Sequence, residues 1–290
     1  MIAFIILHYK NLEDTMECIE SIMALKTNKQ LEIIVVDNHT LDEQGIITLQ
    51  RYPIHLIPLD NNMGFAKANN IGCQYAIKNF HPDFLVVSNN DIVIEDEAFI
   101  NKVYQADEKL HFDLLGPKIK TNSGQSVNPF PVYKTKEEVK YQIQKTKKLI
   151  KIYKNIILRN LLKYYLKIKS ILKIQHFVTN GEKLEYQVAL HGCFIIFSKH
   201  YYEQYQDVFY NETFLYHEEE FLYQRILHNH LISIYDPEIE IYHKEGASLN
   251  YQYQNKEYSK LVFKNKEILK SLMLLEKEMD QYESSEANAK

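Results

Sequence analysis

The sequence predicts an α/β fold with a Rossmann-like, mostly parallel central sheet that is flanked by helices. Short apolar runs alternate with segments of helical periodicity through residues 1–120. This alternation is typical of a parallel sheet with helices on both faces. In addition, 46% of the 290 residues are hydrophobic, so the chain can bury a sizeable core. Polar residues follow several of the apolar runs, as they do where ligands bind at the carboxyl ends of parallel strands.

Each expected element of the first half has its own pattern. The apolar run at residues 2–7 is short and has no basic residue before it, so we expect a first strand rather than a signal peptide. Similar apolar runs predict further strands at residues 31–36, 54–58, 83–88 and 113–120. Apolar residues at three- and four-residue spacing predict helices at residues 12–25, 41–51, 64–79 and 95–109.

The second half begins after a break, because residues 121–131 are rich in residues that favour turns. A strand pattern returns later, and the expected elements are a strand at 186–197, a helix at 214–229, short strands at 231–235 and 239–243, and a long amphipathic helix at 258–282. We expect one domain over residues 1–250 that includes a helical basic insertion at about 134–175. A C-terminal amphipathic helix and frayed tail would follow at 251–290.

Positive charge is concentrated in one stretch. Residues 134–173 hold twelve Lys, one Arg and two Glu, whereas the whole chain has a net charge of −4. The stretch has no Gly or Pro, which predicts one or two helices. One interpretation is an amphipathic arm that lies on an anionic membrane surface. The other is a solvated helical insertion. Nucleic acid is not an expected partner, because no recognition motif accompanies the basic residues.

Missing motifs narrow the class of protein. The sequence has no GxxxxGK[ST], GxGxxG, HExxH or GxSxG, which argues against P-loop kinases, Rossmann dehydrogenases, zinc proteases and α/β-hydrolases. No apolar run reaches the roughly 18 residues of a membrane-spanning helix. The three cysteines form no CxxC pair, which indicates a reduced setting. We therefore expect a cytoplasmic protein, or one that is peripheral on the inner face of a bacterial cell membrane.

Polar residues at the ends of the first, second and fourth predicted strands are expected to share one rim of the sheet. These residues are His8-Tyr9-Lys10, Asp37-Asn38 and Asn89-Asn90-Asp91. Asp37 could accept hydrogen bonds from a ribose, or it could cap the next turn. The carboxylate of Asp91 suits a hard divalent cation, to which a diphosphate would supply further oxygens.

Gly64 is expected to open a helix whose free backbone N–H groups favour phosphate, with Lys67 one turn further on. The alternative is a helix start in which the polar residues face water.

Glu218, Glu219 and Glu220 project about 100° apart on a helix, so at most two can share a face. One of them could be a general base, or all three could form an acidic helix start that the helix dipole favours. His243 follows a strand and could bind metal or phosphate, or it could be structural.

Taken together, these segments resemble the bacterial family 2 glycosyltransferases with the GT-A fold, above all the rhamnosyltransferase-like and capsule-assembly branch. The resemblance covers about residues 1–120 and 186–245. The segment Asn62-Met-Gly-Phe-Ala-Lys-Ala-Asn-Asn70 is close to the family's Asn-x-Gly-Phe-Ala-x-x-Asn-Asn signature, and the other matches are Ile33-Ile-Val-Val-Asp-Asn38, Asn89-Asn90-Asp91, His191-Gly-Cys-Phe-Ile-Ile-Phe-Ser-Lys199, the segment 214–225 and His243.

The resemblance implies an inverting enzyme that moves a hexose or deoxyhexose from UDP-hexose or dTDP-rhamnose to a glycan or polyprenyl-linked acceptor in surface polysaccharide assembly. It implies that Asp91 and His243 bind Mg²⁺ or Mn²⁺, that Glu219 is the base with Glu218 the next candidate, and that His191 and Gly192 flank the acceptor. The donor contacts that it implies are His8, Tyr9, Asp37, Asn62, Gly64, Lys67, Asn69, Asn89, Asn90 and Asp91.

The chain departs from the family pattern at two motif positions and in the basic stretch 134–173, which matches none of the shared motifs, and the first of these departures leaves a non-catalytic role open. Asn89 stands where the family has the first acid of its DxD motif, and Glu219 stands where the family has Asp. The alternatives are a non-catalytic scaffold subunit of a glycan assembly complex and a sugar nucleotidyltransferase. A homodimer is also left open.

Overall fold

The computed structural model describes residues 1–122, 126–159, 182–244 and 257–289. The chain forms two compact units. The first unit comprises Met1–Val132, Asn180–Phe214 and Glu218–Ser248. The second comprises Tyr133–Thr179, Leu215–His217 and Leu249–Lys290. The described part of the basic stretch groups with the C-terminal helix, and the predicted domain bounds stay a prediction.

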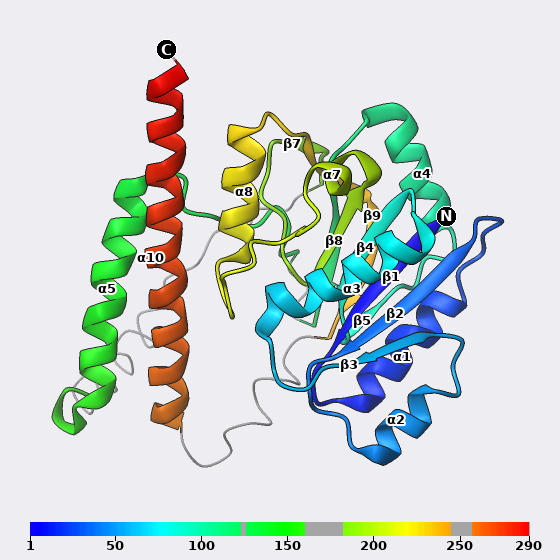
Figure 1. The fold of residues 1–290 in the computed structure, drawn as a ribbon, viewed down its shortest axis with the longest axis horizontal. Coiled ribbons are helices and arrows are strands. Elements are labelled where there is room, and N and C mark those ends of the chain that lie inside the picture. Colours follow the sequence, from blue (N-terminus) through cyan, green and yellow to red (C-terminus); the bar gives the residue numbers. More distant parts are fainter. Residues whose placement is uncertain (123–125, 160–181, 245–256, 290) are drawn as a thin grey trace. The chain divides into compact units, whose positions relative to one another are not determined.

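The first unit contains a mixed sheet that has nine strands in the described residues. The strand order is β3-β2-β1-β4-β8-β6-β9-β5, and β7 pairs with β9 beside this path (Figure 1). The strands are β1 (Ile2–His8), β2 (Leu31–Asp37), β3 (His55–Pro58), β4 (Phe84–Asn89), β5 (Ile92–Val93), β6 (Leu114–Thr121), β7 (Glu185–Tyr186), β8 (Phe194–Ser198) and β9 (Ser233–His243).

Strand direction decides which residues meet at the site. β1 pairs in parallel with β2 and β4, and β2 pairs in parallel with β3. β8 is antiparallel to both β4 and β6, so β6 and its parallel partner β9 run in the same direction as β4. The carboxyl ends of β1, β2, β4 and β9 therefore lie at one rim, together with the amino end of β8.

Helices cover both faces of this sheet, as the fold prediction requires. They are α1 (Leu12–Met23), α2 (Glu43–Leu49), α3 (Gly64–Phe80), α4 (Phe99–Leu110), α7 (Lys199–Gln204) and α8 (Glu218–His228). Alternate residues of β1 enter two separate hydrophobic clusters. Phe4 lies in the cluster that also holds Ile19 of α1 and Val103 of α4. Ile5 lies in the cluster that also holds Ala68 of α3 and Leu222 of α8. The predicted α/β class is confirmed.

The differences from the predicted elements are local. The strand expected at 186–197 is two strands, β7 and β8, with a loop between them that carries His191 and Gly192. The strands expected at 231–235 and 239–243 form one strand, β9, whose pairing with β6 shifts register between Pro117 and Lys118. Helix α8 begins at Glu218, because the two residues before it have left-handed backbones with φ of 73° and 71°. β5 and α7 were not predicted because each is very short.

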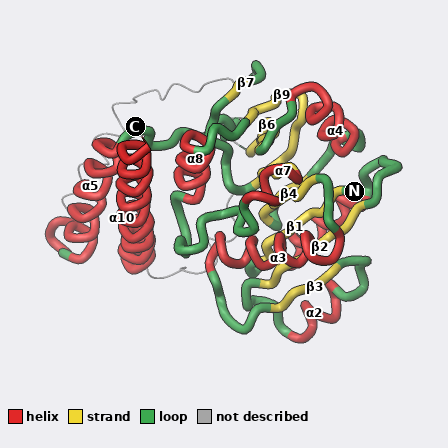
Figure 2. Tube along the Cα trace, turned by 45° about the horizontal axis from the view of Figure 1, so that its top comes forward, coloured by secondary structure: helices red, strands yellow, loops and turns green. Residues whose placement is uncertain are grey.

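The second unit contains two long helices, α5 (Lys136–Lys154) and α10 (Glu257–Ala289), which pack side by side (Figure 2). Lys136 pairs with Asp280 and with Glu283, the latter at 3.1 Å, and the guanidinium of Arg159 lies 4.4 Å from the ring centroid of Tyr258. The start of α5 thus lies beside the end of α10, so the helices are antiparallel. The predicted helical basic stretch is confirmed through residue 159, and the remainder of that prediction lies outside the described residues. No helix in the described part of the chain combines the length and the apolar character needed to cross a membrane.

Candidate active site

The sheet register brings the predicted strand ends together. His8 pairs with Asp37, and Leu7 pairs with Asn89. At the other part of the rim, His243 ends β9 and pairs with Ile92 of β5. Residues that are far apart in the sequence therefore meet at one rim, as predicted from the parallel strands.

Asp91 and His243 form a close pair at this rim. His243 Nε2 lies 3.1 Å from Asp91 Oδ1, and the two side chains are 8% and 12% exposed for Asp91 and His243, respectively. A backbone hydrogen bond from Lys244 N to Asp91 O, 3.1 Å long, holds the two strands in register here. His243 Nδ1 is buried and has no hydrogen-bond partner among the described residues. The ring of His191 follows at a centroid distance of 6.4 Å from that of His243.

This pair fits a divalent cation only in part. A carboxylate oxygen and an imidazole nitrogen are both donors that divalent metals accept. No group of three or more His, Cys, Asp and Glu residues within the described ranges has the arrangement of a complete metal site. Any cation held by Asp91 and His243 would therefore need further oxygens from a phosphate-bearing ligand or from water, and it would have to replace their direct contact.

Glu219 is held over the loop that precedes β8. Its Oε1 accepts a hydrogen bond of 3.0 Å from the backbone N–H of Gly192, and the side chain is half-buried. A Cβ at position 192 would lie 3.1 Å from the same oxygen, so glycine permits this close approach. His191 is half-buried beside it, and burial lowers the pKa of His191 while the Glu219 carboxylate partly raises it. A carboxylate and two imidazoles thus share this side of the rim.

Glu218 differs sharply from its neighbour. It is buried at the first residue of α8, and its Oε1 has no hydrogen-bond partner among the described residues. Burial raises the pKa of Glu218 to about 8, and the charge of Glu219 contributes to the same shift. A raised pKa favours the protonated form of Glu218, which accepts a proton less readily than an ionised carboxylate, so Glu219 is the preferred candidate base. Glu220 is also buried.

Asp37 and Asn38 tie the end of β2 to the segments that follow it. Asp37 Oδ1 accepts hydrogen bonds from Thr40 N at 2.9 Å and from Leu41 N at 3.2 Å. Asn38 Oδ1 accepts from Met63 N at 2.8 Å, and its Nδ2 donates to Gly64 O at 3.0 Å. The capping alternative for Asp37 is therefore what the structure contains, and a ribose contact stays a prediction. The role of Asn38 was missed, although it stands beside Asp37 in the sequence.

Two N–H groups at the start of α3, where a phosphate site is predicted, already have protein partners. Asn62 Oδ1 accepts from Gly64 N at 2.9 Å, and the carbonyl of Phe214 accepts from Phe65 N at 2.8 Å. These N–H groups, which were expected to be free for phosphate, donate to protein oxygens. Gly64 is needed for another reason, since its φ is 82° and an added Cβ would lie 2.2 Å from the Phe214 carbonyl oxygen.

The remaining residues of this segment differ in exposure. Lys67 is exposed and is available to a ligand. Asn69 is buried, and its Nδ2 donates to Phe65 O within α3 at 3.0 Å. Asn70 forms two hydrogen bonds of 3.0 Å with the backbone of Phe209, one to its carbonyl and one from its N–H. Asn70, and not Asn69, thus links α3 to the loop before α8.

His8 and Asn90 form a buried group with Thr15 of α1. His8 Nδ1 lies 2.6 Å from Thr15 Oγ1, and Asn90 Nδ2 donates to the same oxygen at 3.0 Å. His8 has no exposed surface, and burial lowers its pKa to about 4 although Asp37 opposes this. His8 Nε2 has no hydrogen-bond partner among the described residues, and the donor contacts predicted for His8 and Asn90 stay predictions. Tyr9 and Asn89 are half-buried, and their predicted contacts stay predictions.

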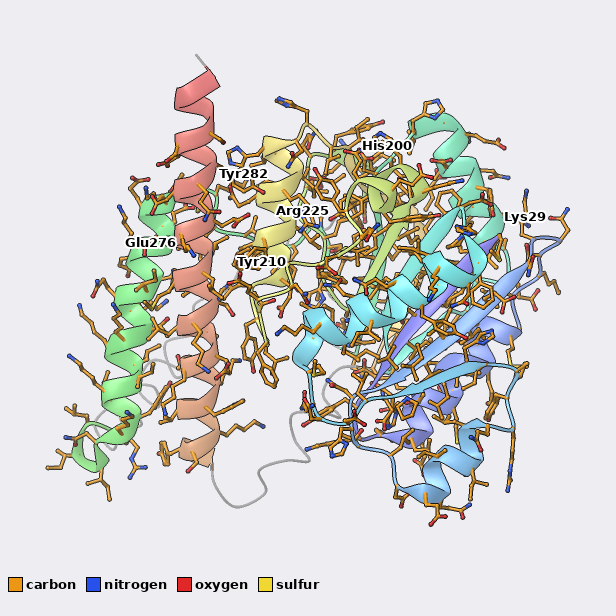
Figure 3. The ribbon with its side chains drawn as sticks, viewed as in Figure 1. Lys29, His200, Tyr210, Arg225, Glu276 and Tyr282 are labelled. Atoms are coloured by element: carbon orange, nitrogen blue, oxygen red, sulfur yellow. The ribbon has the colours of Figure 1, made fainter. Side chains whose placement is uncertain are left out.

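Arg225 ends the segment 214–225 that resembles the family, and its role in this structure is to hold the chain in place. It lies on α8, as Figure 3 shows, and its Nη1 donates to Tyr201 OH at 2.8 Å and to Asp207 O at 3.0 Å. The guanidinium also lies 4.7 Å from the ring centroid of Tyr205. Arg225 therefore fixes the loop that leads to Glu218 and Glu219.

Comparison with known families gives one match over most of the chain. The model of the family described as Glycosyl transferase family 2 matches residues 3–204. No curated protein matches the chain.

Solved structures of S. aureus TarS share the fold. TarS 1–349 matches with a TM-score of 0.52 and 14% identity, and the match covers 91% of this chain and 64% of that chain. TarS 1–349 in complex with UDP-GlcNAc matches with a TM-score of 0.50 and 16% identity, over 91% and 66% of the two chains. TarS itself matches with a TM-score of 0.50 and 14% identity, over 84% and 36%. At such identities the likeness shows the fold alone.

Proposed function

The chain belongs to glycosyl transferase family 2, and from this premise we propose that it is an inverting glycosyltransferase. Its substrates would be a nucleotide-diphosphate sugar, which donates a hexose or deoxyhexose, and a hydroxyl group of a glycan acceptor in bacterial surface polysaccharide or glycoconjugate assembly. The observation that carries the proposal is the convergence of the Asp91–His243 pair and Glu219 at the rim where open α/β sheets bind ligands.

Asp91 and His243 are the residues that would hold Mg²⁺ or Mn²⁺. A bound cation would offset the negative charge that develops on the leaving diphosphate. The protein provides two donors, and the donor diphosphate would supply oxygens of its own. Asn89, in place of an acid, lowers the negative charge of this site, so the protein alone would hold the cation more weakly and the diphosphate oxygens would matter more to its binding.

Glu219 is the proposed general base. The Gly192 N–H holds one carboxylate oxygen, and the half-buried side chain is accessible to an acceptor. In the reaction the acceptor oxygen forms a bond to the anomeric carbon as the bond from that carbon to the diphosphate oxygen breaks. The acceptor proton passes to Glu219. Attack opposite the leaving group inverts the anomeric centre.

The identity of the donor nucleotide can be tested directly by binding measurements. A related fold was solved with UDP-GlcNAc, so UDP-GlcNAc is the first donor to examine, followed by other UDP-hexoses and by dTDP-rhamnose. The acceptor class is a glycan or a polyprenyl-linked glycan. The basic helix of the second unit suits association with an anionic membrane surface on the cytoplasmic side, where such acceptors are anchored.

Titration calorimetry with UDP and with dTDP, each with and without Mn²⁺, tests the donor site. We expect one nucleoside diphosphate to bind and the cation to tighten its binding. A screen of donor hydrolysis then identifies the sugar. If neither nucleoside diphosphate binds at high concentration, the transferase proposal fails. Binding without donor hydrolysis or transfer would instead favour a scaffold subunit, and release of pyrophosphate from a nucleoside triphosphate and a sugar phosphate would identify a nucleotidyltransferase.

A further inference from the structure

We infer that the first helical turn after α5, which holds Ile156, Ile157 and Leu158, is an aliphatic tip that inserts into the headgroup region of an anionic lipid bilayer beside a lysine stripe on α5. This inference rests on the membrane association proposed above and does not depend on the transfer reaction. The aliphatic side chains would contact the lipid, and their contribution to membrane binding is separate from that of the lysines.

The three aliphatic side chains are unusually exposed for their type. Ile156, Ile157 and Leu158 are 64%, 68% and 41% exposed, respectively. On a helix these three residues project about 100° apart, so at most two share a face, and exposed large aliphatic side chains of this kind indicate an interaction site. All three lie in the second unit, directly after the end of α5.

The turn is held in place from both ends. Asn155 ends α5, and its Oδ1 accepts hydrogen bonds from Ile157 N at 3.0 Å and Leu158 N at 3.2 Å, as an N-cap does. Arg159 stacks on Tyr258 of α10 at 4.4 Å. Because both flanking residues have partners, the exposed aliphatic side chains belong to a capped helix start.

The neighbouring surface of α5 is basic. At 100° per residue, the four lysines of the stripe project within about 60° of one another, beside the helix face that Val139 and Ile143 bury. All four are exposed or half-buried, and none forms an ion pair with another described residue. The lysine stripe consists of Lys140, Lys147, Lys151 and Lys154.

An anionic bilayer suits this combination better than the other partners. A second copy of the chain would bring two lysine stripes together, which like-charge repulsion opposes. A nucleic-acid site would pair its cations with stacking aromatic residues, whereas the tip presents aliphatic side chains. A basic face next to exposed aliphatic residues is typical of helices that lie in a membrane interface. Each lysine near such a surface strengthens binding by about fivefold.

The tip can be followed with a single reporter, because the chain has no Trp. Ile157→Trp places the only tryptophan at the tip, and Ile47→Trp is the matched control on α2, where Ile47 is 44% exposed in the first unit. Vesicles of phosphatidylcholine alone are compared with vesicles that also contain phosphatidylglycerol. We expect a blue shift of the Ile157→Trp emission with the anionic vesicles, and no shift for Ile47→Trp.

Cosedimentation of the full chain with the same vesicles separates the two contributions. Lys147→Glu/Lys151→Glu should lose most binding, while the control Lys78→Glu/Lys109→Glu, which changes the net charge equally, should bind like the wild type. Ile156→Ser/Ile157→Ser should bind roughly tenfold more weakly and should lose the fraction that resists high salt.

The outcomes distinguish failure of the tip from failure of the proposed function. If the protein binds anionic vesicles but Ile157→Trp shows no blue shift, or Ile156→Ser/Ile157→Ser binds like the wild type, the tip is not inserted. If the wild type binds no anionic vesicle, or if it binds single-stranded nucleic acid instead, the membrane association is wrong as well. Hydrolysis of a soluble donor by Ile156→Ser/Ile157→Ser should equal that of the wild type, and this measurement tests the transferase proposal separately.

Discussion

Two groups of polar residues occupy the same rim, and they differ in how their hydrogen-bonding atoms are used. On the side of β2 and β4, Asp37, Asn38 and Asn90 all bind other protein groups. On the side of β8, α8 and β9, Glu218 Oε1 and His243 Nδ1 have no partner among the described residues, and burial raises the pKa of Glu218. His8 Nε2, at the end of β1, is a further buried atom without a partner among the described residues. We conclude that Asp37, Asn38 and Asn90 build the rim and that the unsatisfied atoms mark where a ligand would meet it, since perturbed and unsatisfied groups gather at functional sites.

The difference has a physical cause in the chain connections. Asp37 accepts hydrogen bonds from backbone groups three and four residues further on, whereas Asn38 and Asn90 bind groups 25 to 79 residues away that the fold brings to them. Glu219 and His243 come from later elements that reach the rim through the antiparallel strand β8 and the bulged strand β9. Four substitutions test this comparison, and they follow in order of expected effect.

Glu219→Gln removes the proposed base while keeping an oxygen that can accept from the Gly192 N–H. We expect turnover to fall by about a hundredfold to ten-thousandfold, with nucleotide affinity unchanged. Glu212→Gln is the matched control, because Glu212 is exposed in the loop before α8. Steady-state rates together with calorimetry provide the measurement, and full turnover by Glu219→Gln would remove Glu219 from the mechanism.

Asp91→Asn should lower the transfer rate by roughly a hundredfold to a thousandfold, because it removes the only carboxylate of the Asp91–His243 pair. Nucleotide binding in the presence and absence of Mn²⁺ tests whether Asp91 holds the cation. The wild type should gain affinity when Mn²⁺ is added, and the variant should not. An equal gain in both proteins would show that the cation is held elsewhere.

Asn38→Ala should affect stability rather than chemistry. The change leaves Met63 N and Gly64 O without their side-chain partner, which costs about 1–3 kcal/mol of unfolding free energy. Asn79→Ala is the control, since its exposed side chain donates only to Tyr75 O of its own helix. Urea unfolding of both variants gives the comparison, and equal stabilities would mean that Asn38 does not hold the rim together.

Glu218→Gln should change the pH dependence of stability. The folded-state pKa of Glu218 is raised from 4.5 to about 8, so the folded protein holds this proton more tightly than the unfolded chain. The stabilising contribution is present below about 4.5 and is lost as pH rises to about 8. Wild-type stability should therefore fall relative to Glu218→Gln over this range, as melting temperatures would record. A constant difference between the two proteins would contradict the raised pKa.

Much of the first unit could be predicted from local pattern. The strand at 31–36 and the helix at 64–79 lie within one or two residues of β2 and α3, because their apolar periodicity matches the faces they bury. The same patterns failed where the tertiary structure bends the chain. Two left-handed residues delay the start of α8 to Glu218, and no periodicity signals such backbone conformations.

For the candidate site, too, some features follow from the sequence and others only from the tertiary structure. The sequence alone indicates which residues reach the rim, since strand order and polar strand ends place Asp37, Asn89 and Asp91 there. Only the tertiary structure decides what each residue does. Asp37 and Asp91 are both aspartates that follow buried strands, yet one accepts hydrogen bonds from Thr40 and Leu41 and the other faces His243, 152 residues away. Side-chain chemistry is local, but hydrogen-bond partners and burial depend on segments that only folding brings together.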